Sequence, residues 1–217
     1  MSVSATAVKE LRDRTGLGFM DCKKALTETN GNLDEAVVWL RKKGLAKSAK
    51  LASRIASEGI VYSYIHGEGR IGVLLELNCE TDFTARNQQF QTLAKEIALH
   101  IAATNPRFLS REDVTQAVLE QERDIAAEQA RASGKPPQVV EKIVEGKLDK
   151  FYEENCLLEQ KFVKDNSKSV GELIKGLTAT IGENISLRRY TRYHVGEGLQ
   201  KREDNFAVEV AKQAKIS

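Results

Sequence analysis

The spacing of apolar residues changes near residue 58, and this change restricts the folds open to the chain. Before it, apolar side chains recur every three or four residues, which is the period of one face of an α-helix. Beyond it, Ile60 to Ile65 is rich in β-forming residues, and the apolar residues from Ile71 to Leu77 alternate as in a half-buried strand. Because Gly67 to Gly69 separates the two runs, they predict a β-hairpin.

Residues 1–44 show a self-contained pattern of three short helices. Asn32, with Glu35 three residues later, is typical of a reciprocal cap at the start of the third helix, and Gly44 is typical of a stop at its end. The three apolar stripes are Val8 and Leu11, then Phe19, Cys22, Ala25 and Leu26, then Leu33, Ala36, Val37 and Leu40. We therefore predict a small three-helix domain over 1–44.

Residues 45–57 continue as a basic helical linker. Lys47, Lys50 and Arg54 recur at intervals of about one helical turn. A solvated face is the default interpretation of such a pattern, and a docking surface is the alternative.

The remaining chain, 58–217, predicts a core domain in which helices follow the hairpin. An amphipathic helix covers Phe90 to Ile101, and a short turn at 134–137 joins two long helical patterns into an antiparallel helical hairpin over 111–155. Further elements are a helix at 169–182, a third strand from Ile185 to Val195 and a last helix at 205–214. Segregated strands and helices favour the α+β class, with a small antiparallel three-stranded sheet.

Charge and hydropathy exclude several classes of protein. Lys and Arg number 33 against 31 Asp and Glu, so the chain lacks the basic excess of a protein that mainly neutralises nucleic-acid phosphates. No apolar run approaches the roughly 20 residues that cross a bilayer. The charged N-terminus is unlike a signal peptide. We expect a cytoplasmic protein without membrane or direct nucleic-acid contact, or one from an organelle matrix or stroma if a transit peptide was removed.

No motif indicates catalysis, a metal or a cofactor. The string G-x-G-x-x-G at Gly67 to Gly72 precedes a strand, so it offers no helix N-terminus to a pyrophosphate. The cysteines are scattered, which favours small buried thiols, and the histidines favour surface imidazoles; they are Cys22, Cys79, Cys156, His66, His100 and His194. Cys79, near a strand end, has no histidine placed beside it for a nucleophilic role. We expect a protein that is not an enzyme.

Phe83 is unusual because it lies in a polar run between a predicted strand and a predicted helix. It could fold back onto the sheet while Thr81, Asp82 or Thr84 caps the helix. It could instead be exposed on a rigid turn and act as an interface hot spot. The local pattern leaves both interpretations open.

The segment Thr81-Asp82-Phe83-Thr84-Ala85-Arg86-Asn87 resembles the signature of the elongation factor Ts family, T-D-F-V-A-[RK]-N, with Thr84 at the valine position. Other collinear matches are Leu11–Gly16, Met20–Leu26, Glu145–Gln160, Ile181–Ile185 and Val195–Gly198. The resemblance spans essentially the whole chain and is to the short form, with one core unit. It implies that the N-terminal domain is ubiquitin-associated-like (UBA-like).

The resemblance also implies a function. Family members are guanine-nucleotide exchange factors for elongation factor Tu in protein biosynthesis and need no cofactor. It implies that residues 81–87 contact Tu, with Phe83 and Asp82 as the wedge that disturbs the Mg²⁺ and phosphate site. Further Tu contacts are expected at Lys23, Lys24, His66, Ile181 and Gly182. The short form is expected to be a homodimer that gives a two-plus-two complex.

Two other classes of function are open to a chain of this pattern. A UBA-like adaptor would bind other helices or nascent chains and would keep its partner without residues 58–217. A nucleic-acid-binding protein would use the basic stretch 41–54 with Arg188, Arg189 and Arg192, and its RNA binding would depend steeply on salt.

Overall fold

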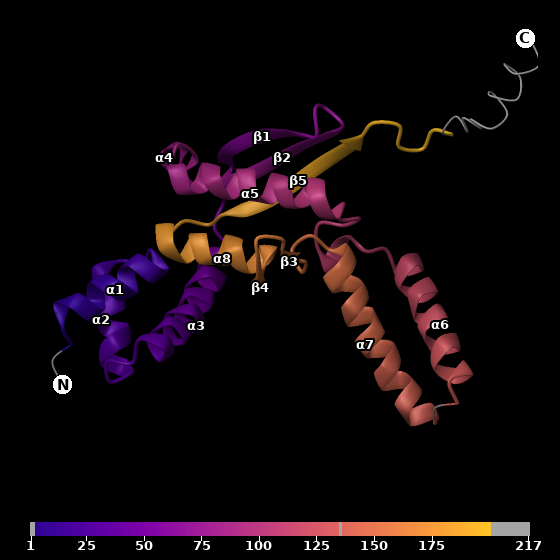
Figure 1. Ribbon diagram of the computed structural model, residues 1–217, viewed down its shortest axis with the longest axis horizontal. Helices are drawn as coiled ribbons and strands as arrows, with labels where there is room; N and C mark the ends of the chain where they lie inside the picture. The colour runs from indigo at the N-terminus through magenta and orange to yellow at the C-terminus, as the bar shows by residue number, and fades with distance from the viewer. Residues whose placement is uncertain (1–2, 135, 201–217) are drawn as a thin grey trace, which may run out of the picture.

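A computed structural model describes residues 3–134 and 136–200 of the chain, and the predicted helix at 205–214 lies outside them. At the N-terminus, α1 (Ala5–Thr15), α2 (Phe19–Glu28) and α3 (Leu33–Leu51) pack around their own small core (Figure 1). Val8, Leu11 and Leu26 are buried there at the expected helical spacing. The predicted three-helix arrangement is confirmed.

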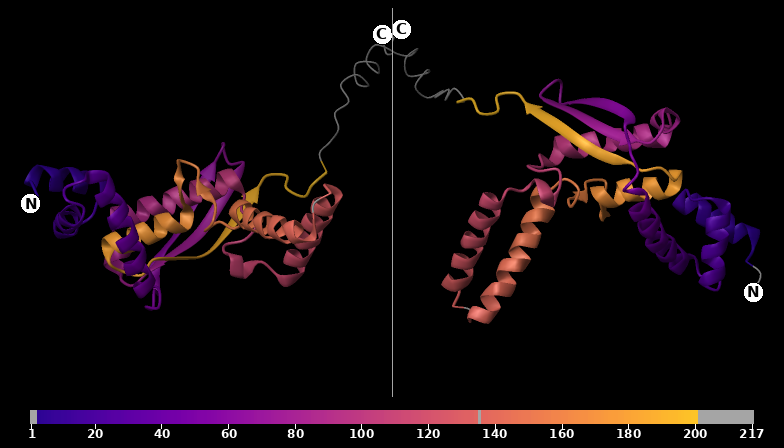
Figure 2. Two further views of the ribbon diagram at one scale, coloured as in Figure 1. Left: turned by 90° about the horizontal axis from the view of Figure 1, so that it is seen from below. Right: turned by 180° about the vertical axis from the view of Figure 1, so that it is seen from behind.

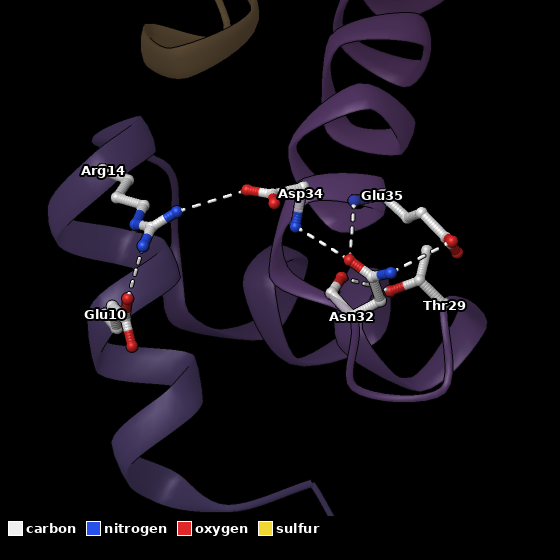
Figure 3. Close-up of polar contacts among 6 residues, drawn as sticks. All are labelled: Glu10, Arg14, Thr29, Asn32, Asp34 and Glu35. Carbon is white, nitrogen blue, oxygen red and sulfur yellow. Dashed lines mark hydrogen bonds and ion pairs between the residues drawn. The ribbon is translucent and has the colours of Figure 1, made fainter.

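The start of α3 is capped by Asn32, as predicted (Figure 3). The Asn32 Oδ1 accepts hydrogen bonds from the backbone N–H groups of Asp34 and Glu35, at 3.0 and 3.1 Å. The reciprocal half differs from the prediction, because Glu35 accepts from the Asn32 side-chain amide at 3.0 Å. The backbone N–H of Asn32 already donates to the Thr29 carbonyl, so it is not available.

The predicted helix stop at Gly44 is wrong, since α3 continues to Leu51. Here α3 crosses α8 (Val170–Ile181), and a Cβ atom on Gly44 would lie 3.2 Å from the Cβ of Ala179. Glycine therefore serves close helix packing at this position. Lys47 Nζ donates to the Ala179 carbonyl at 2.9 Å, so the basic face of α3 docks partly on the core.

The core sheet has the order β1-β2-β5 and is antiparallel throughout. Its strands are β1 (Glu58–His66), β2 (Ile71–Cys79) and β5 (Ser186–His194), as the hairpin and third-strand patterns predicted. The helix α5 (Gln88–Thr104) lies along one face of the sheet (Figure 1). The alternating residues Leu75 and Leu77 meet Phe90 from this helix in the main hydrophobic core. The mixed α+β class is confirmed.

The predicted helical hairpin is also present, and α6 (Gln116–Ala132) packs against α7 (Pro137–Asn155). A separate 3-10 turn, η1 (Arg111–Asp113), precedes it and carries the capping box of Ser110 and Asp113. The hairpin and the N-terminal helices project from opposite ends of the core (Figures 1 and 2). The sequence patterns missed the short pair β3 (Lys161–Phe162) and β4 (Asp165–Ser169), which has too few residues to show a period.

The prediction of a surface imidazole is wrong for His100, which is completely buried on α5. Its Nδ1 accepts from the backbone N–H of Val163 at 3.3 Å, and its Nε2 lies 2.9 Å from Gln160 Oε1. Burial lowers the pKa of His100, and the contact with Gln160 offsets this only in part. His66 and His194 are exposed, and all three cysteines are buried free thiols, as expected.

Candidate functional site: the strand-to-helix turn at residues 80–87

The segment after β2 forms a single helical turn, α4 (Asp82–Ala85), before α5 begins. Thr81 is its N-cap, and the Thr81 Oγ1 accepts from the N–H of Thr84 at 3.3 Å. A second cap follows at once, because Asn87 Oδ1 accepts from the N–H of Gln89 at 2.8 Å and starts α5. Two consecutive caps therefore split the segment into two helices, where the sequence predicted one.

The split determines where the side chains of α4 point. Thr84 and Ala85 are buried against the core, while Phe83 is 79% exposed. The interpretation in which Phe83 folds back onto the sheet is therefore wrong. An isolated exposed aromatic costs no stability in itself, but one held on a braced turn has the form of an interface anchor.

The turn is braced by Glu183, which follows the end of α8. The carboxylate accepts from both the backbone N–H and the hydroxyl of Thr81, at 3.1 and 2.7 Å. Burial raises the pKa of Glu183, but hydrogen bonds from the Thr81 and Thr84 side chains and from nearby backbone outweigh it, so the net pKa is lowered. The brace therefore consists of charge-assisted hydrogen bonds at neutral pH.

The carboxylate of Glu80, just before the turn, makes the reciprocal contact with the segment that follows α8. Glu80 Oε1 accepts from the backbone N–H of Asn184 at 2.6 Å. The Asn184 side chain donates to the Arg54 carbonyl at 2.7 Å, and the Arg54 guanidinium lies 3.5 Å from Glu80. Three chain segments, 52–54, 80–81 and 183–184, are thus joined beside α4.

The polar side chains on α4 itself are more accessible. Asp82 forms an ion pair with Arg86 at 3.0 Å, and both side chains are largely in contact with solvent. Such a pair is worth at most about 1 kcal/mol, so a competing group could separate it.

Cys79 lies beneath the turn with its thiol donating to the Thr81 carbonyl, and burial raises the pKa of Cys79 to about 11. A buried protonated thiol is a poor nucleophile.

Only some of the other predicted residues lie near this turn. Ile181 and Gly182 directly precede Glu183, and Gly182 ends α8 in the left-handed conformation at φ 87°. Lys23 and Lys24 are exposed on α2, in the N-terminal unit. His66 ends β1, whereas Glu58 at the start of that strand pairs with Cys79 beside the turn. At about 3.3 Å per residue, this strand separates His66 from the turn by roughly 26 Å.

Sequence reasoning assigned no role to the three residues that brace the turn, which are Glu80, Glu183 and Asn184. Glu183 and Asn184 are part of Ile181–Ile185, one of the segments that carry the family resemblance. The signal was therefore visible in the sequence, but it carried no indication of what these residues contact.

Neither a metal-ligand cluster nor a membrane-spanning helix is found among the described residues. Within 3–134 and 136–200, no three His, Cys, Asp or Glu side chains are grouped so as to hold a metal ion. No helix in these ranges is long and apolar enough to span a membrane.

The fold and this turn define a mixed α+β protein that presents an aromatic side chain from a braced strand-to-helix junction. The family model described as elongation factor TS matches residues 21–197. The chain is 60% identical to an elongation factor Ts of Alkaliphilus oremlandii, over 98% of each chain. It is 57% identical to one of Desulforamulus reducens, over 98% of each chain, and 56% identical to one of Geobacter metallireducens, over 99% of each. The chain belongs to the elongation factor Ts family.

Proposed function

We propose that this chain is the guanine-nucleotide exchange factor for elongation factor Tu, so that it promotes GDP release and allows GTP to bind. Membership in the elongation factor Ts family supports a role in protein biosynthesis. The observation that carries the finer proposal is Phe83, which is 79% exposed on the turn that resembles the family signature.

In this proposal, Phe83 and Asp82 are the wedge. Phe83 inserts between helices of the GTPase, where burial of its ring supplies the apolar anchor. Asp82 meets the elements that position Mg²⁺, and its carboxylate disturbs a site balanced around a cation. The exposure of both side chains and the weak pairing of Asp82 with Arg86 support this assignment. The surrounding residues Thr81, Thr84, Ala85, Arg86 and Asn87 complete the proposed contact segment.

The wedge acts by coupling two binding equilibria. If this chain binds the nucleotide-free GTPase more tightly than the loaded one, nucleotide binding is weakened by the same coupling free energy. No covalent step on a substrate is required, so the proposed role is not that of an enzyme and needs no cofactor.

Further contacts with Tu are proposed away from the wedge. Ile181 and Gly182 are next to the brace at Glu183, which supports a contact continuous with α4. The exposure of Lys23 and Lys24 supports docking of the N-terminal unit on the nucleotide-binding domain. His66, at the end of the β1–β2 hairpin that is distant from α4, would be a separate contact.

We also propose a homodimer through the core sheet, giving a two-plus-two complex. The face of the sheet opposite α5 exposes an apolar group formed by Val61, Ile65, Leu74 and Tyr193. Burial of such a group by a second copy would remove it from water.

The proposed division of labour follows the predicted domains. Residues 1–44 form the UBA-like domain, 45–57 the linker, and 58–217 the dimerisation and Tu-binding core. The proposed role in translation supports a cytoplasmic location, or an organelle matrix or stroma if a transit peptide was removed. Direct binding of nucleic acid is not part of the proposal.

The test is the release of fluorescent GDP from purified elongation factor Tu. Addition of this protein is expected to accelerate release, and the acceleration should saturate with its concentration. An unchanged rate at all concentrations would contradict the proposal. Removal of residues 58–217 should abolish the acceleration, whereas an adaptor that acts through the N-terminal unit alone would still bind its partner.

A further inference from the structure

The helix that carries Phe83, α4, is too short to be stable on its own. A single turn fixes several residues for very few hydrogen bonds, so α4 (Asp82–Ala85) would not persist in isolation. Its orientation must therefore be set by contacts with other parts of the chain. Thr84 and Ala85 are buried against the core, and the hydrogen bonds to Glu183 are made by Thr81, the residue that caps the helix.

The Thr81 hydroxyl has one hydrogen, and Glu183 determines where it points. The hydroxyl donates to Glu183 Oε1 at 2.7 Å, which leaves its lone pairs to accept the Thr84 N–H at 3.3 Å. The other carboxylate oxygen holds the Thr81 backbone N–H at 3.1 Å. Both the cap and the backbone at the start of α4 thus depend on one side chain from the end of α8.

Glu183 is itself held in place from both sides. Gly182 closes α8 in the left-handed conformation immediately before it. Asn184, immediately after it, is bound by Glu80 at 2.6 Å and donates to the Arg54 carbonyl at 2.7 Å. The C-terminal end of α8 also accepts a hydrogen bond from Lys47 of α3. Glu183 is therefore part of a hydrogen-bonded frame beside α4.

We propose that Glu183 is a positioning residue for nucleotide exchange, whose carboxylate sets the direction of Phe83 through Thr81 without touching the GTPase nucleotide site. The expected effect on GDP release rests on the proposed function, whereas the expected effect of Glu183 on the orientation of α4 does not. The frame holds α4 in its binding orientation before the partner arrives. Without it, only a fraction of molecules would present Phe83 correctly, and apparent affinity falls by that fraction.

Pre-organisation and direct contact have different kinetic signatures. Glu183→Gln keeps the size of the side chain but can accept only one of the two hydrogen bonds from Thr81. Loss of a charge-assisted hydrogen bond corresponds to a population change of about tenfold. The variant should therefore need about tenfold more protein for half-maximal GDP release, while the limiting rate stays within about twofold. Phe83→Ala should instead lower the limiting rate.

Thr81→Val tests whether Glu183 acts through Thr81, because it removes the hydroxyl and keeps the shape. It should raise the half-maximal concentration in the same way, and the double variant should cost less than the sum of the two single variants, because both lose the bond between the Thr81 hydroxyl and Glu183. Additive effects would overturn the proposal. Glu159→Gln is the matched control, since Glu159 also makes two hydrogen bonds, both to Arg111 at 2.8 and 2.7 Å, away from α4.

Hydrogen exchange at the backbone amide of Thr84 separates the inference from the proposed function, because it needs no GTPase. Glu183→Gln and Thr81→Val should each speed exchange at Thr84 by about tenfold, with Ile97 and Ile101 in the core unchanged. Glu159→Gln should leave Thr84 unchanged. Unchanged Thr84 exchange in Glu183→Gln overturns the inference even if the wild-type protein releases GDP. Failure of the wild-type protein to release GDP, with Thr84 exchange altered, overturns only the proposed function.

Discussion

Phe83 and Phe90 are two phenylalanines on adjacent helices, and one is exposed while the other is buried. Phe83 on α4 is 79% exposed, whereas Phe90 on α5 has no exposed surface and lies in the main core with Leu75 and Leu77. The two caps at Thr81 and Asn87 produce this difference. A break between the helices lets the first point an aromatic outward while the second packs against the sheet.

Hydrophobicity does not by itself assign a phenylalanine to the core, because these two identical side chains have opposite exposure. Burial of Phe90 contributes to folding, so its removal should be measured in stability. Phe83 contributes little to folding, so its removal should be measured in the interaction that the chain makes. The two positions together give a test in which each variant controls for the other.

The largest effect on stability is expected for Phe90→Ala. Truncation of a fully buried phenylalanine leaves a cavity and should reduce the free energy of unfolding by about 3–5 kcal/mol. Urea unfolding followed by circular dichroism measures this change. Phe90→Leu, which preserves most of the volume, should lose less than half as much. A loss below about 1 kcal/mol for Phe90→Ala would show that this part of the core is not tightly packed.

Phe83→Ala should have the opposite profile. The free energy of unfolding should change by no more than about 0.5 kcal/mol, because the side chain is exposed. GDP release from elongation factor Tu should slow by roughly thirtyfold or more, the loss expected for an interface hot spot worth about 2 kcal/mol. Comparable damage to stability and exchange would indicate that the ring supports the fold after all.

Low pH should destabilise the fold through His100, which is buried on α5. Because burial lowers the pKa of His100 below its ordinary value of 6.5, the unfolded chain takes up a proton more readily than the folded one. Stability is therefore complete above about pH 6.5 and should fall as the pH drops below it. Unfolding free energies at several pH values down to about 5 measure the slope, before most carboxyl groups titrate.

His100→Asn is the control for this titration. It should lower stability at every pH, because it leaves a small cavity, but it should flatten the slope between about pH 7 and 5. An unchanged slope would assign the acid sensitivity to another group. Exposure of Phe83 should not depend on this titration, since α4 is braced by Glu183, whose pKa is lowered by its hydrogen bonds.

The smallest effect is expected for Asn87→Ala, which removes the cap that separates the two helices. Loss of an N-cap costs about 1 kcal/mol, and the amide of Gln89 should exchange faster because it loses its acceptor. Asn87→Asp should preserve the cap and serve as the control. If Asn87→Ala leaves both quantities unchanged, the break between α4 and α5 is set by the brace at Glu183 alone.

Much of the fold could be predicted because its helices and strands follow from residue spacing and capping residues that are close together in the sequence. The alternation from Ile71 to Leu77 predicted the central strand, and Asn32 predicted the start of α3. The pattern at Gly44 failed, since a glycine that ends one helix and a glycine that admits a neighbouring helix look the same in sequence. Only the contact with Ala179 distinguishes them.

For the candidate site, the sequence indicated the segment 81–87 and the family to which the chain belongs, and the resemblance implied an exposed Phe83, but the local pattern left the orientation of this side chain undecided. That orientation depends on a carboxylate 102 residues away, which holds Thr81 across the core. Patterns of period two or three to four report only neighbours along a strand or a helix. Contacts such as Glu183 with Thr81, or His100 with Gln160, arise only when separate elements pack together, so the tertiary structure alone decided them.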